Sequence, residues 1–184
     1  MPSAKYELYF LDEALKELTS FLLSKSLYWP LGLKRWPGEQ PYPRLTLGTL
    51  LLSRARLQAF RDDVPAEAAA MDEKLENFKN RWSVIYQNKA AAEFPVRLRR
   101  WTALLDEKNR TQYANSVRLR VILHLLAGTL DKPPGESSML DGLDVTLRRL
   151  LVPSDFVWDA ALAPAFPQEP YWYLWGLPRK PHKG

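Results

Sequence analysis

The segment MDEKLENFKNRWSVI, residues 71–85, contains the clearest periodicity in this chain. Its apolar side chains recur at alternating steps of four and three residues, at Met71, Leu75, Phe78, Trp82 and Ile85. Because an α-helix has about 3.6 residues per turn, this spacing places all of them on one face of a helix. The pattern predicts a long helix that starts near Pro65 and packs through an apolar stripe.

Similar spacing predicts further helices on either side of this segment. They carry Leu8, Leu11, Leu15, Leu18 and Leu22; then Leu47, Leu50, Leu51 and Leu57 after an N-cap at Thr46; then Phe94, Leu98, Trp101 and Leu105 after a kink or restart at Pro95; then residues 111–130; then Leu140, Leu143, Leu147 and Leu150. The helix at 111–130 is apolar on most sides, so we expect it to be the central one. No segment alternates apolar and polar residues for long enough to predict a sheet. We therefore expect an all-α, single-domain antiparallel bundle of five to six helices.

The predicted domain covers residues 1–162, and a tail rich in Pro and aromatic residues, 163–184, packs on it or flanks it. A chain of 184 residues suits one domain with its own core. No apolar run reaches the roughly 18 residues that span a membrane, and the N-terminus lacks an export signal. The chain has no Cys, which excludes disulfides and cysteine nucleophiles. We expect a cytoplasmic protein without membrane contact.

Metal and cofactor chemistry finds little support in the sequence. Residues three before His124 and His182 are Val and Arg, so neither His belongs to the Glu-x-x-His motif of di-metal bundles. There is no phosphate-binding Gly-rich loop and no nucleophile elbow. We expect no metal, no cofactor and no catalytic residue.

Two carboxylate pairs keep one enzymatic alternative open. Glu73 and Glu76 form an E-x-x-E pair, and Asp141 and Asp144 form a D-x-x-D pair, a combination found around magnesium in all-α nucleotide hydrolases. The apolar stripe of the third helix directs Glu73 and Glu76 towards solvent. A magnesium-dependent hydrolase is therefore the least favoured function.

Positive charge is concentrated in one part of the chain. The net charge is +5, and residues 95–131 hold seven basic residues against three acidic ones. Guanidinium groups match phosphate oxygens, so such an array can bind a nucleic-acid backbone. The candidate contact residues are Arg97, Arg99, Arg100, Arg120 and His124, with Arg54 and Arg56 on the second helix. An ordinary solvated face is the alternative.

Arg118 is predicted to have a different role. It falls within the apolar arc of the fifth helix and has no carboxylate three or four residues away. Because a buried, unpaired Arg is very costly, we expect a structural ion pair with Asp144, with Asp141 or Asp106, or with a bound anion.

Residues 97–151 resemble a known family. The sequence RRWTALLDEKNRTQYANSVRLRVILHLL followed by MLDGLDVTLRRLL is similar to the C-terminal half of the small helical subunits of CRISPR effector complexes. These subunits are basic and helical, and they line a nucleic-acid path without catalysis. The resemblance implies that Arg97, Arg99, Arg100, Arg118 and Arg120 contact the backbone, within a larger complex.

Two segments are rich in aromatic residues and Pro. They are LYWPLGLKRWPGEQPYPRL at 27–45 and PYWYLWGLPRKP at 170–181, and together they hold eight of the fifteen Trp and Tyr residues. We expect Tyr28, Trp29, Trp36 and Tyr42 to cover the bundle, against Trp172 and Trp175. The alternative function is a scaffold that docks a protein partner through these rings, since Trp, Tyr and Arg dominate interface hot spots.

Overall fold

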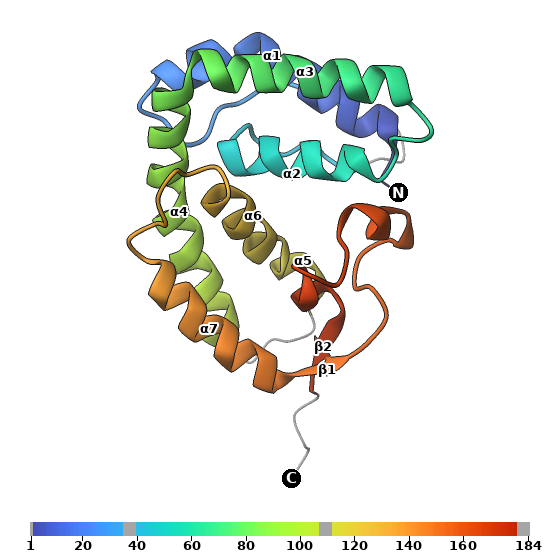
Figure 1. Ribbon diagram of the computed structural model, residues 1–184, viewed down its shortest axis with the longest axis vertical. Coiled ribbons are helices and arrows are strands. Elements are labelled where there is room, and N and C mark those ends of the chain that lie inside the picture. The colour runs from blue at the N-terminus through green and yellow to red at the C-terminus, as the bar shows by residue number, and fades with distance from the viewer. Residues whose placement is uncertain (1, 35–39, 107–111, 180–184) are drawn as a thin grey trace.

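The computed structural model describes residues 2–34, 40–106 and 112–179, and these residues form an all-α, single-domain fold. Seven α-helices lie within them (Figure 1). They are α1 (Ala4–Leu23), α2 (Leu47–Gln58), α3 (Pro65–Arg81), α4 (Ser83–Asp106), α5 (Tyr113–Ser116), α6 (Arg118–Ala127) and α7 (Ser137–Leu150). The strands β1 (Leu151–Pro153) and β2 (Gly176–Pro178) and the 3₁₀ helices η2 (Ala160–Ala165) and η3 (Trp172–Leu174) complete the chain. No described helix combines the length and the apolar character needed to cross a membrane.

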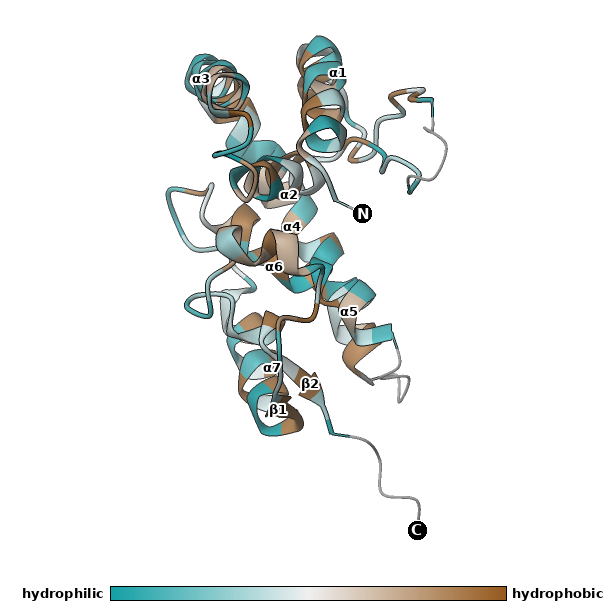
Figure 2. Ribbon diagram, turned by 90° about the vertical axis from the view of Figure 1, so that its right-hand side faces the viewer, coloured by the Kyte–Doolittle hydropathy of each residue, from teal (hydrophilic) through white to brown (hydrophobic). Residues whose placement is uncertain are grey.

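The helices form two groups that meet at α2 and α6. Helices α1, α2 and α3 lie side by side at one end of the molecule, and α4 descends from the end of α3 towards α7 (Figure 1). Figure 2 shows α1 and α3 end-on, with α2 below them and α6 beneath α2. Helix α6 contacts both α2 and α4, and six of its ten residues are buried. The prediction that this helix is central is confirmed.

The long third helix ends earlier than the sequence suggested. The break lies at Trp82, which has φ −114° and ψ 27°, whereas Pro95 lies inside α4. Met71 and Leu75 are buried as predicted, but a second buried stripe starts at Tyr86. Helix α3 packs on α1, whereas α4 packs on α6 and α2. One straight helix could not contact both groups of neighbours, so the chain breaks between α3 and α4.

The N-terminus of α2 lies where the sequence predicted it, because a cap depends on local hydrogen bonds. Thr46 caps α2 as predicted: its Oγ1 accepts from the Thr49 N–H at 3.0 Å, and Thr49 Oγ1 accepts from the Thr46 N–H at 2.8 Å. The segment expected at 111–130 is divided at Val117, where the Arg120 N–H bonds to the Val117 carbonyl, three residues back. A tighter turn therefore precedes α6.

The C-terminal segment is part of the core. Strands β1 and β2 pair antiparallel, with Leu151 opposite Pro178, so the chain returns to the end of α7. Phe166, Tyr173 and Leu174 are fully buried. Three-residue strands are too short to produce the alternation that identifies a strand in a sequence.

Gly48 marks the closest approach between α2 and its neighbours. A Cβ atom at this position would overlap Ile122 Cγ2 of α6 and lie 2.8 Å from Glu93 Oε1 of α4. The position is helical and its backbone conformation is ordinary, so glycine is not needed for its dihedral angles. It is required because the neighbouring side chains leave no room for a Cβ atom.

We predict that Gly48→Ala lowers the free energy of unfolding by about 1–3 kcal/mol, because the added methyl group forces α2 away from α6. Gly142→Ala is the matched control, since nothing lies within 4 Å of a Cβ at that exposed position of α7. The control should be neutral or stabilising by up to about 1 kcal/mol. Urea denaturation of both variants measures the difference, and equal stability would contradict the close packing.

Candidate nucleic-acid interface

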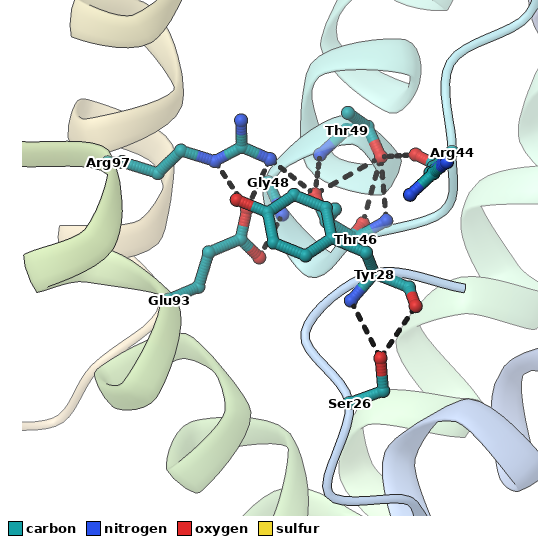
Figure 3. Close-up of polar contacts among 8 residues, drawn as sticks. All are labelled: Ser26, Tyr28, Arg44, Thr46, Gly48, Thr49, Glu93 and Arg97. Carbon is teal, nitrogen blue, oxygen red and sulfur yellow. Dashed lines mark hydrogen bonds and ion pairs between the residues drawn. The ribbon is translucent and has the colours of Figure 1, made fainter. Parts of the chain in front are cut away.

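Arg97 belongs to a buried polar network rather than to a free surface (Figure 3). Its Nε donates to Glu93 Oε1 at 2.8 Å, and its Nη2 donates to Thr46 Oγ1 at 2.9 Å. Glu93 in turn accepts from the Gly48 N–H at 3.0 Å. The network ties α4 to the N-terminus of α2. Arg97, predicted as a nucleic-acid contact, therefore has its guanidinium held inside the fold by Glu93 and Thr46.

Arg54 and Arg120 also have carboxylate partners. Arg54 joins α2 to α3 through Asp72 at 2.8 Å and Glu76 at 3.0 Å. Arg120 is 8% exposed and forms a bidentate pair with Asp144, at 2.8 and 2.6 Å. In both cases carboxylates within the fold neutralise the charge of the guanidinium. Each of these two predicted contact residues instead connects two helices through its guanidinium.

His124 is a poor cation in this environment. It is half-buried, and its ring contacts Tyr171 edge to face, with centroids 5.1 Å apart. Burial lowers its pKa, and the nearby Arg120 lowers it further. The imidazole is therefore neutral at pH 7, and His124 has no charge to offer to phosphate.

The ion pair predicted for Arg118 is formed by Arg120 instead. Asp144 is occupied by Arg120, and Arg118 is exposed with no hydrogen bond or ion pair to a described residue. Residues two apart on a helix face opposite sides, since each residue turns the helix by about 100°. Because α6 begins at Arg118, the residue lies at the end of the helix and not within its apolar arc.

Three guanidinium groups lie near enough to Arg118 to repel its charge. Its pKa is lowered by partial desolvation and then by repulsion from Arg100, Arg56 and Arg97, and no carboxylate opposes the shift. We call Arg56, Arg97, Arg100 and Arg118 the arginine cluster. It brings together side chains of α2, α4 and α6. Arg100 and Arg118 are exposed, whereas Arg56 is about a quarter exposed and stands 5.2 Å from the Trp158 ring.

Arg56 is only weakly balanced by a carboxylate. Its Nη1 lies 4.0 Å from Glu7 Oε1, and its buried Nε has no hydrogen-bond partner among the described residues. Burial raises the pKa of Glu7 to about 7, against the opposing effects of Arg56 and of a 2.5 Å hydrogen bond from Ser53 Oγ. At neutral pH the Glu7 carboxyl is therefore about half protonated.

Arg99 is exposed on α4, as predicted, but no interaction joins it to the arginine cluster in the described residues. Sequence reasoning missed Glu7 and Glu93. Both lie on the buried stripe of their helix, beside Leu11 and Phe94. An acid within an apolar stripe is the signal that could have identified them.

Two aromatic residues of segment 27–45, Trp29 and Tyr42, contact α1. Tyr42 stacks on Tyr6 with ring centroids 4.3 Å apart, and Trp29 Nε1 donates to Glu17 at 3.2 Å. The Trp29 and Leu45 backbones exchange two hydrogen bonds of 2.8 Å. Tyr28 is 40% exposed. Trp36 lies outside the described residues.

The expected contact of these rings with Trp172 and Trp175 is not formed by the described residues. Trp172 carries the Arg148 guanidinium 3.8 Å above its ring, and Trp175 Nε1 donates to the Phe166 carbonyl at 3.0 Å. Each aromatic segment covers a different part of the fold, since one lies on α1 and the other at the end of α7.

The structure does not bring together the carboxylates of the hydrolase hypothesis. Glu76 pairs with Arg54, and Asp144 pairs with Arg120. Glu73 and Asp141 are exposed on separate helices, α3 and α7. In the part of the chain that the structure describes, no group of three or more His, Cys, Asp or Glu residues could hold a metal ion. The convergence on magnesium that this hypothesis requires is absent from these residues.

No family model, curated protein or solved structure matches this chain. The resemblance of residues 97–151 to the small subunits of CRISPR effector complexes stays a prediction. Its five arginines differ in availability: Arg97 and Arg120 are buried in ion pairs, whereas Arg99, Arg100 and Arg118 are exposed.

We predict that Arg97→Met destabilises the fold by about 3–5 kcal/mol, because it leaves the Glu93 carboxylate buried without its partner. Arg99→Met removes the same charge from the solvent-exposed side of α4 and should change stability by less than about 0.5 kcal/mol. Chemical denaturation compares the two. Similar stability of both variants would show that Arg97 is not part of a buried network.

We predict that Glu7 makes the fold less stable as the pH rises from about 4.5 to about 7. In this window the folded state retains the proton that the unfolded chain has lost, so rising pH favours unfolding by about 3 kcal/mol in total. The Glu7→Gln variant, whose amide resembles the protonated acid, should not show this pH-dependent loss of stability. Denaturant titrations of both proteins across the window give the difference, and parallel pH curves would refute it.

Proposed function

We propose that this protein is a non-enzymatic subunit of a cytoplasmic complex and binds the phosphate backbone of nucleic acid through the accessible members of the arginine cluster, Arg56, Arg100 and Arg118. The observation that supports this most strongly is that three neighbouring guanidinium groups repel Arg118, whose exposed side chain has no carboxylate partner among the described residues. Cations that repel one another in the free protein are stabilised when an anion joins them.

The chemistry of the cluster suits phosphate. Guanidinium groups offer planar pairs of N–H donors that match phosphate oxygens, and release of counterions supplies free energy. Arg118 is the first residue of α6, so the positive end of the helix dipole adds to its field. The chain as a whole carries a net charge of +5.

The size of the cluster argues for a larger complex. Arg100 and Arg118 are exposed, and Arg56 is partly so. Only about two to four phosphate contacts can form, which corresponds to a salt slope of roughly −2 to −4 and to weak binding by the isolated chain. Other subunits would supply the remaining contacts, as the resemblance of residues 97–151 also implies.

Docking of a protein through exposed aromatic residues is supported less well. Tyr28 is exposed, whereas Trp29, Tyr42, Trp172 and Trp175 are half-buried in contacts with the fold. These four half-buried rings stabilise the fold through their packing, and this role accounts for their presence.

We predict that Arg118→Glu abolishes most of the binding to nucleic acid without weakening the fold, because it removes a guanidinium that its neighbours repel. Fluorescence anisotropy with a labelled oligonucleotide at several salt concentrations measures this. The log–log salt slope should become less steep by about 1 for each phosphate that the variant no longer binds.

Arg81→Glu is the matched control, since Arg81 is exposed at the end of α3 and the change in charge is identical. Arg100→Glu should behave like Arg118→Glu. Equal losses in Arg81→Glu and Arg118→Glu would indicate a response to net charge alone. Binding that does not depend on salt would overturn the proposal.

A further inference from the structure

A small pocket lies between the end of α7, the start of β1 and the segment around η3. Its volume is about 210 Å³, and it is lined chiefly by Arg148, Leu151, Gln168, Trp172 and Trp175. This volume is below the roughly 300–1,000 Å³ of pockets that take drug-sized ligands. It suits a single planar ring system with an apolar face and polar edges.

Arg148 is preorganised in this pocket. Its guanidinium lies 3.8 Å above the Trp172 ring, and it forms no hydrogen bond or ion pair with the described residues. The helical spacing suggests Asp144 as its partner, but Asp144 is held by Arg120. The flat guanidinium therefore keeps its N–H donors and its second face for a ligand.

A continuous row of rings connects this pocket with the arginine cluster. Trp175 contacts Phe156 with centroids 5.2 Å apart, and Phe156 contacts Trp158 at 6.2 Å. Arg56 of the arginine cluster lies 5.2 Å from the Trp158 ring. All three rings are half-buried, so each leaves part of its surface accessible.

We propose that the pocket of Arg148, Trp172 and Trp175 binds an unpaired base of a single nucleic-acid strand whose phosphates lie on the arginine cluster. This inference rests on the proposed function and narrows its ligand to single strands. Bases stack on aromatic rings and on guanidinium planes with little regard to sequence. Gln168 offers an amide to the edge of the base. A duplex cannot use the pocket, because its bases are already stacked and paired.

The test compares four probes of equal length by anisotropy: an oligothymidylate, an oligouridylate as its RNA equivalent, an abasic strand with the same phosphates, and a duplex. We expect the protein to bind the base-containing strands roughly tenfold more tightly than the abasic strand. We expect Arg148→Met, which keeps the apolar stem of the side chain, to remove most of this preference.

Arg149→Met is the control for Arg148→Met, because Arg149 is the adjacent exposed arginine and does not line the pocket. It should retain the preference for bases. Trp175→Leu should lose the preference while its circular dichroism shows that the helices remain.

The outcomes separate the two proposals. Equal affinity for abasic and base-containing strands refutes the base pocket and leaves phosphate binding by the arginine cluster intact. A preference that survives Arg148→Met and Trp175→Leu also refutes the pocket. Absence of binding to every probe refutes the proposed function and the base pocket with it.

Discussion

The buried carboxylate of Glu93 is the interaction on which the arrangement of the helices depends. It accepts the Gly48 N–H at the start of α2 and pairs with Arg97 one turn further along α4, so it satisfies groups on two helices at once. Because Gly48 has no side chain, Ile122 of α6 can pack directly on the same turn. Three helices thus meet around one acid, and a buried acid requires such complete satisfaction.

The pairing of buried charges also determines which arginines remain without a carboxylate partner. Wherever a carboxylate faces an arginine across a helix contact, as Asp144 faces Arg120 and Asp72 faces Arg54, the pair stabilises the contact between helices. Arg100 and Arg118 have no such partner among the described residues, and Arg56 has only a half-protonated one. The members of the arginine cluster therefore keep charge that the pairing of buried residues does not neutralise, where α2, α4 and α6 supply their side chains.

The sequence predicted the helical class, the Thr46 cap and the central α6, because periodicity and capping are local properties. It could not predict that Trp82, rather than Pro95, ends α3, since that depends on which neighbours α3 and α4 must cover. The environments of charged residues were the hardest to predict. A basic residue on a helix flank can face solvent or a tertiary partner, and the choice between Arg118 and Arg120 for Asp144 depends on the break at Val117. The sequence named Arg56, Arg97 and Arg100 as candidate contacts and Arg118 through the resemblance, but it could not separate these four from Arg54, Arg99 and Arg120.

The late position of Tyr173 in the chain has a consequence for folding. The Tyr113 hydroxyl donates to the Tyr173 carbonyl, 60 residues away in sequence, and the Tyr173 ring covers the Arg120 guanidinium at 4.6 Å. During synthesis α6 therefore emerges long before the residues that enclose its polar side. Contacts of such high sequence separation form slowly, because the intervening chain must first be ordered. Until Tyr173 has emerged from the ribosome, the Arg120 side of α6 stays open to water.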